Sequence, residues 1–165
     1  MTAPFDLPVT AQMIEFIRSI GLPVKFDVVD AGAFLPGIAI ANGGLSIHRE
    51  RLLYPGDLLH EAGHLAMLTP QERSLCSARL PVDGGQEMGA IAWSYAAAVY
   101  LGLDADVVFH GDGNKGDTAS LRDNFQQGHY LGVPYLQWLG LSWEPHQAVA
   151  RCVPAYPAML RWLRE

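Results

Sequence analysis

Two patterns of apolar and polar positions occupy the first part of the chain, and each predicts a different element. From 10 to 20 the apolar side chains fall three or four positions apart, which predicts an amphipathic helix that Gly21-Leu22-Pro23 would end. Short runs of alternating apolar and polar residues then flank the turn signal Asn42-Gly43-Gly44, and they predict strands and a hairpin. The predicted strands cover residues 24–29, 36–41 and 45–48.

Two longer apolar segments predict buried helices in the middle of the chain. The first covers 58–68 and follows the breaker sequence 54–57, in which Asp57 is a suitable N-cap residue. Thr69-Pro70 would stop this helix, because proline disfavours the α conformation in the residue before it. The second segment predicts a helix over 85–101.

The C-terminal part of the chain is predicted to be helical after one glycine-rich loop. Residues 111–117 lack the Gly-Lys-Ser/Thr ending of a phosphate-binding loop and match a calcium loop only in part, so a turn or a flap is expected there. Further helical or hydrophobic segments are predicted over 118–130, 133–141 and 156–163. The expected class is α+β in one domain, with an N-terminal helix and small sheet followed by helices.

Composition narrows the class of protein. Half of the 165 residues are hydrophobic and 17% are charged, which is typical of a well-packed chain. The formal net charge is −6 and no Lys/Arg cluster occurs, so nucleic acid is not an expected partner. Neither a signal peptide nor a membrane span is predicted, which favours a cytoplasmic protein without membrane contact. Cys76 and Cys152 form no CxxC pair, and a reduced state is expected for both.

The sequence His60-Glu61-Ala62-Gly63-His64 carries the chemistry of the first buried helix. At positions i and i+4, the two imidazoles lie one above the other on one face, which is the spacing needed to share a metal ion. Glu61 lies about 100° round the helix and can take a proton without occupying a ligand position. Two core histidines are the alternative, but burying two imidazoles and a carboxylate on one turn is costly.

Glu87 is the best candidate for a third ligand, at the start of the second buried helix. It is the only acid in that helix, and the spacing of Asp83 and Gln86 before it is that of a capping box. The side chains on the neighbouring face of this helix are mostly small. With Gly63 on the facing helix, they would let the two helices approach closely. Glu87 could instead be an ordinary first-turn acid, and Asp83 is a rival ligand. The residues of that face are Ala90, Ile91, Ser94 and Ala98.

This arrangement resembles the gluzincin branch of the zincin-like metallopeptidases, over residues 57–101 only. The resemblance implies a compact zincin-like domain in which His60, His64 and Glu87 bind zinc and Glu61 is the general base. Larger members usually have an acid four residues after the glutamate ligand, where this chain has Ile91. Asp57 or Asp83 could take that supporting role. The metzincin pattern fails, because Pro70 stands where its third histidine would be.

The sequence therefore predicts a zinc-dependent hydrolase with a peptide or protein substrate. It does not indicate the oligomeric state. Tyr95 is proposed as a catalytic residue that stabilises the oxyanion, with Tyr54, Tyr130, His110 and His129 as other candidates. Two alternatives remain open. One is a non-catalytic zincin-like binding or regulatory domain with a structural zinc, and the other is a small-molecule amidase.

Overall fold

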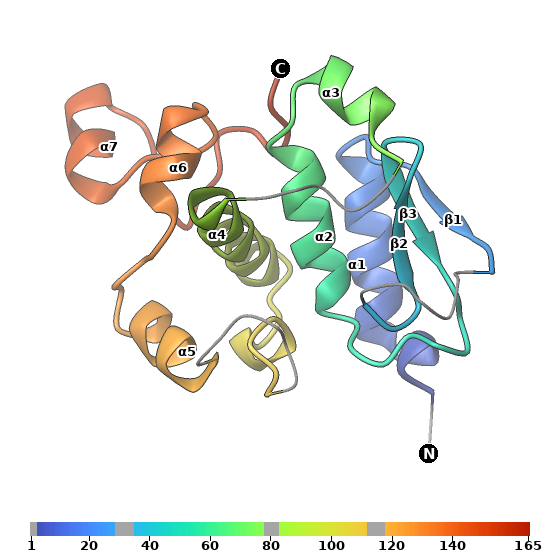
Figure 1. Cartoon of the computed structure of the whole chain (residues 1–165). Helices are drawn as coiled ribbons and strands as arrows, with labels where there is room; N and C mark the ends of the chain where they lie inside the picture. Colours follow the sequence, from blue (N-terminus) through green and yellow to red (C-terminus); the bar gives the residue numbers. More distant parts are fainter. Residues whose placement is uncertain (1–2, 29–34, 78–82, 112–117) are drawn as a thin grey trace.

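The computed structural model describes residues 3–28, 35–77, 83–111 and 118–165, and it confirms the predicted α+β class (Figure 1). An N-terminal helix and a small sheet are followed by helices through most of the remaining chain. The elements are η1 (Pro4–Asp6), α1 (Pro8–Ser19), β1 (Val24–Phe26), β2 (Ile38–Ala41), β3 (Gly44–Ile47), α2 (Asp57–Ala66), α3 (Pro70–Leu75), α4 (Gly84–Tyr100), η2 (Ala105–Val107), α5 (Thr118–Gln126), α6 (Val133–Trp138) and α7 (Pro145–Arg151). None of these helices is long and apolar enough to cross a membrane.

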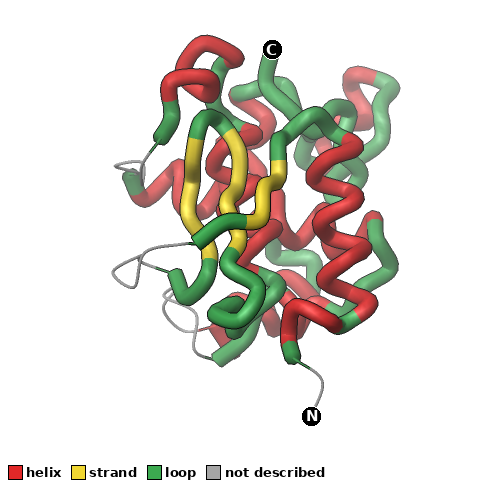
Figure 2. The backbone as a smooth tube through the Cα atoms, turned by 90° about the vertical axis from the view of Figure 1, so that its right-hand side faces the viewer, coloured by secondary structure: helices red, strands yellow, loops and turns green. Residues whose placement is uncertain are grey.

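The sheet is mixed, with strand order β1-β3-β2, and its three strands lie side by side in Figure 2. β1 runs parallel to β3, whereas β2 is antiparallel to β3 across the predicted turn. Asn42 and Gly43 both have positive φ, at 50° and 72°, as a tight hairpin turn requires. Helices α1 and α2 cover one face of the sheet, where its buried residues lie (Figure 1). These residues are Val24, Ile38, Ile40, Leu45 and Ile47.

Helix α4 lies between α2 and α6 and is buried along most of its length (Figure 1). Its N-terminus has the predicted capping box. The Asp83 carboxylate accepts from the Gln86 backbone N–H at 2.8 Å, and the Gln86 side chain accepts from the Asp83 backbone N–H at 3.1 Å. Two donors at the helix end are thereby satisfied, which fixes where α4 begins.

The predicted N-cap of the first buried helix was wrong, and the short helix that follows it was not predicted. Helix α2 begins at Asp57 itself, with Gly56 as N-cap and no side-chain cap. A Cβ at position 56 would collide with the Val107 carbonyl oxygen, so the backbone here is too close for a capping side chain. Thr69 and Pro70 follow the end of α2 and begin α3, an unpredicted helix in which Thr69 and Glu72 form a second capping box.

The prediction of a closing helix over 156–163 was also wrong, because this segment forms no regular helix. Its backbone groups form hydrogen bonds with distant residues instead of the helical bonds to residues four positions away. The Tyr156 N–H donates to the Trp143 carbonyl at 2.8 Å, and the Leu160 N–H donates to the Leu141 carbonyl at 2.9 Å. Pro157 has no N–H to donate to a helix. A short helix, α7, precedes this segment and was not predicted.

Candidate metal centre

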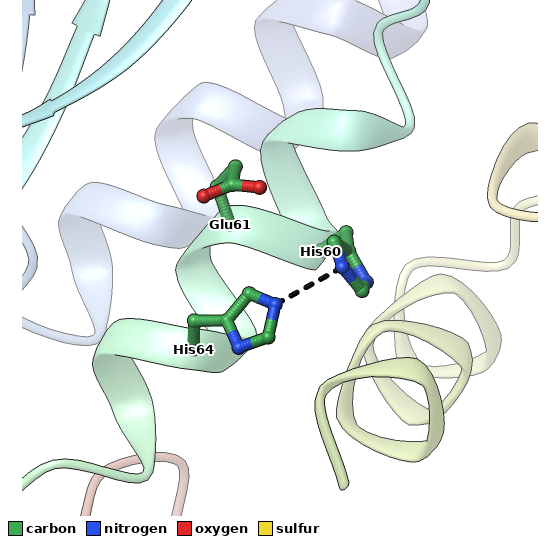
Figure 3. Close-up of side chains that lie close together, drawn as sticks. All are labelled: His60, Glu61 and His64. Atoms are coloured by element: carbon green, nitrogen blue, oxygen red, sulfur yellow. Dashed lines mark hydrogen bonds between the residues drawn. The ribbon is translucent and has the colours of Figure 1, made fainter. Parts of the chain in front are cut away.

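His60 and His64 lie one turn apart on α2 and direct their ring nitrogens at each other (Figure 3). The two Nε2 atoms are 3.1 Å apart, and the rings meet edge to face with centroids at 4.6 Å. Both residues are buried, at 5% and 7% exposure. The helical spacing therefore produces the paired imidazoles that the sequence predicted.

The Glu87 carboxylate completes this arrangement from the first turn of α4. Its Oε1 lies 3.1 Å from His60 Nε2, and its Oε2 lies 3.3 Å from His64 Nε2. Hydrogen bonds from His60, and then from His64, hold the pKa of the Glu87 carboxyl well below its usual range, against the opposing effect of partial burial. Glu87 is thus a carboxylate that faces two imidazole nitrogens on another helix.

Protons alone do not satisfy the three contacts among these groups. If both imidazoles carry hydrogen on Nε2, each can donate to Glu87, but the two N–H groups then face each other across 3.1 Å. If one Nε2 carries no hydrogen, its lone pair faces a carboxylate oxygen instead. A cation between the three side chains would attract the lone pairs of all of them. The donor set is therefore one that a metal ion fits.

Glu61 belongs to the same neighbourhood but projects from a different side of α2 (Figure 3). Ligand atoms of His60, Glu61 and His64 all lie within 4.8 Å of one another, so this group could hold a metal ion. Glu61 is half-buried, whereas the two histidines are buried. The site thus has two carboxylates, Glu61 beside the histidines on α2 and Glu87 opposite them on α4.

The two helices come this close because Gly63 has no side chain. A Cβ at Gly63 would lie 3.1 Å from the Ala90 carbonyl oxygen, 3.3 Å from the Ala90 Cα and 3.3 Å from Trp93 Cε3. These separations are shorter than ordinary van der Waals contact between carbon atoms. The predicted close approach of Gly63 to the small face of α4 is confirmed.

A second polar group fixes the beginning of α2. His110 Nε2 lies 2.9 Å from Asp57 Oδ1, and the His110 ring stacks on Tyr54 with centroids 4.3 Å apart and planes 8° apart. Asp57 is only 3% exposed. Sequence reasoning missed this pair because 53 residues separate its members and no local pattern connects them.

Tyr95 lies in an aromatic cluster two turns further along α4 than Glu87. Its ring is 4.9 Å from that of Phe125 and 6.1 Å from that of Tyr130, and burial followed by the Tyr130 charge raises its pKa. Eight residues of helix span about 12 Å. The catalytic role of Tyr95 remains a prediction. His129 is exposed, and the predicted flap over 111–117 lies outside the described residues except for Gly111.

The supporting partners expected for zinc-binding histidines are incomplete in the described part of the chain. The Nδ1 atom of His64 is buried and has no hydrogen-bond partner there. The two acids considered for this role have other partners, since Asp57 bonds to His110 and Asp83 caps α4. An outer partner of a metal-bound histidine typically contributes 10–100-fold in affinity.

Comparison with known proteins identifies no relative. No protein-family model, no curated protein and no solved structure matches this chain.

Proposed function

We propose that His60, His64 and Glu87 bind a zinc ion, and that the protein is a zinc-dependent hydrolase of peptide bonds. The observation that carries the proposal is three short separations. The two Nε2 atoms are 3.1 Å apart, His60 Nε2 is 3.1 Å from Glu87 Oε1, and His64 Nε2 is 3.3 Å from Glu87 Oε2. Ligands placed 2.0–2.1 Å from a tetrahedral zinc are about 3.3 Å apart. Two imidazoles and one carboxylate are also a ligand set that suits zinc.

Glu61 is the general base in this proposal. A zinc ion held by His60, His64 and Glu87 would supply Lewis-acid chemistry, lowering the pKa of a bound water molecule and polarising a carbonyl group. Glu61 then accepts the proton of the attacking water and delivers it to the amine that leaves. Its place within 4.8 Å of the histidine nitrogens, on a different side of α2, supports this role.

Exposure supports access of a substrate to the site. The Glu87 side chain is 33% exposed, while both histidine side chains are at 7%. The group is therefore more open to solvent at Glu87 than at the two histidines. A peptide would approach along the exposed first turn of α4.

Zinc content and turnover of three proteins test the proposal. Dialysed wild type and Glu61→Gln are expected to hold one zinc per chain by elemental mass spectrometry, while Glu87→Ala holds it weakly or loses it. Wild type loaded with zinc is expected to cleave a peptide mixture, and Glu61→Gln to lose this cleavage. Loss of zinc in Glu61→Gln with retention in Glu87→Ala would make Glu61 the third ligand. Full cleavage by Glu61→Gln would refute the mechanism.

A zinc-binding domain without turnover is the second candidate function. His64 Nδ1, which has no hydrogen-bond partner among the described residues, favours it, together with Ile91 at the place where larger zincin-like enzymes carry a supporting acid. This candidate predicts zinc in wild type and in Glu61→Gln, with no peptide cleaved by either. The same experiment therefore separates the two functions.

A further inference from the structure

An apolar pocket adjoins the first turn of α4, on the flank that faces α6. It has a volume of about 410 Å³ and is lined by Gly85, Met88, Gly132, Pro134, Tyr135 and Trp138. No charged side chain is among these residues. Pockets for side chains and small ligands have volumes of this order and are mostly apolar.

Glycines bring α6 onto α4 and shape the pocket. Gly132 has φ +85° and lies so close to Met88 that a Cβ there would collide with the Met88 carbonyl oxygen. A Cβ at Gly89 would lie 2.8 Å from Tyr135 Cδ1 and 2.8 Å from the Met67 sulfur. Met67 follows His64 by three residues, so the end of the helix that carries the histidines and Tyr135 of α6 meet at Gly89.

One wall of the pocket is an aromatic residue that the fold leaves in solvent. Trp138 is 73% exposed, and its ring meets Tyr135 edge to face with centroids 5.6 Å apart. A large exposed aromatic beside an apolar pocket is typical of a binding surface, because tryptophan contributes strongly to recognition.

The pocket and the proposed metal site lie on two flanks of one helical turn. Gly85 and Met88 border the pocket, whereas Glu87 between them faces the histidines of α2. Crossing the ~10 Å width of a helix takes about three residues of an extended peptide at ~3.3 Å each. A peptide held at the metal site would therefore place a side chain about three residues from the cleaved bond in the pocket.

Two consecutive glycines begin α4. Gly84 and Gly85 are exposed and occupy the first two positions of the helix, although alanine has the higher helix propensity. Packing does not require the first of them, since a Cβ at Gly84 would meet nothing within 4 Å. Neither glycine adds a side chain to the surface at the beginning of α4.

We propose that this pocket binds an apolar side chain of a peptide substrate and determines which peptides reach the metal site. The inference rests on the proposed function, and it names the substrate class: peptides with a large apolar residue about three positions from the cleaved bond. Trp138 and Met88 would contact this residue and act as specificity residues.

Binding measured without turnover tests the inference. Two blocked peptides that differ only in Phe or Asp at one position are titrated by calorimetry into zinc-loaded Glu61→Gln protein, with the position moved along the peptide in a series. Burial of a phenyl ring predicts a preference for Phe of about ten-fold or more at one position. Trp138→Glu, made in the Glu61→Gln background, should abolish this preference.

Val149→Glu is the matched control, because Val149 is an equally exposed apolar residue, at 79%, on α7. This variant should keep the preference for Phe. Equal binding of the two peptides at every position, binding of neither, or a preference that survives Trp138→Glu would overturn the inference.

Failure of the proposed function gives a different result. Wild type that cleaves no peptide, combined with a Phe preference that Trp138→Glu abolishes, refutes the peptidase and keeps the apolar peptide pocket. Cleavage by wild type with no apolar preference refutes the pocket and keeps the peptidase.

Discussion

Replacing Gly63 by alanine should weaken metal binding and have a small effect on the stability of the metal-free fold. The new Cβ would lie 3.1 Å from the Ala90 carbonyl oxygen and 3.3 Å from the Ala90 Cα, which are backbone atoms of the neighbouring helix α4. Carbon atoms pack at about 3.5–4.0 Å, so α4 must move by roughly 0.3–0.5 Å. Glu87 moves with it, away from the two histidines.

The expected magnitudes follow from two opposing effects. Alanine is better than glycine in a helix by about 1 kcal/mol, whereas overpacking a core costs about 1–3 kcal/mol. The free energy of unfolding of the metal-free protein should therefore fall by roughly 0–2 kcal/mol. The shift of α4 by roughly 0.3–0.5 Å uses up most of the ~0.5 Å within which a metal site must hold its ligands, so zinc affinity should fall by about ten-fold.

Gly84→Ala is the matched control, since it makes the same change in α4 where a Cβ meets nothing within 4 Å. It should leave zinc affinity unchanged and leave stability equal or higher by up to about 1 kcal/mol. Competition with a chelator gives zinc affinity, and urea unfolding without metal gives stability. A Gly63→Ala protein that is stabilised and binds zinc within two-fold of wild type would refute the claim that close helix approach sets the ligand geometry.

Three further predictions concern acid stability, the Asp57–His110 pair and Tyr95. Because the pKa of Glu87 is lowered in the fold, its carboxylate stabilises the metal-free protein above the ordinary carboxyl pKa of 4.5, and this contribution is lost as the pH falls below that value. The difference in melting temperature between wild type and Glu87→Gln should therefore shrink from about pH 6 to about pH 3. His110→Phe keeps a ring to stack on Tyr54 and removes the bond to Asp57, so urea unfolding should show a loss of about 1–3 kcal/mol; no loss would mean that the bond contributes nothing. Tyr95→Phe should lower kcat on a cleaved peptide by about 10²-fold if its hydroxyl stabilises the oxyanion, and an unchanged kcat would leave Tyr95 a packing residue.

Local patterns allowed much of the site to be predicted from the sequence. The spacing of His60 and His64, the capping box at Asp83 and the tight turn at Asn42-Gly43 each depend on residues within four positions of one another. Helix and turn geometry converts such spacings directly into positions in space. Glu87 is a long-range partner of the histidines, yet its place could be predicted because it is the only acid in a helix whose face is otherwise small and apolar.

What the sequence could not predict depends on contacts between distant segments. The apolar residues of 156–163 have helical spacing, but their backbone bonds to residues near 141 and 143, which no periodicity reveals. Aspartate is a residue type favoured at helix N-caps, yet the carboxylate of Asp57 is buried against His110. The apolar pocket beside α4 forms from Gly85, Tyr135 and Trp138, and only the packing of α6 brings these residues together.

The irregular C-terminal segment ties together the helices of the candidate site, and it is synthesised after both of them. The Arg164 N–H donates to the Ala66 carbonyl at 2.8 Å at the end of α2, and the Trp162 carbonyl accepts from Trp93 Nε1 on α4 at 3.0 Å. Both helices are made well before these residues leave the ribosome. A nascent chain would therefore carry its histidines and glutamate long before the segment that ties their helices together. Tight metal binding should then require that Trp162 and Arg164 have been added, and a chain stalled before Trp162 should hold metal more weakly.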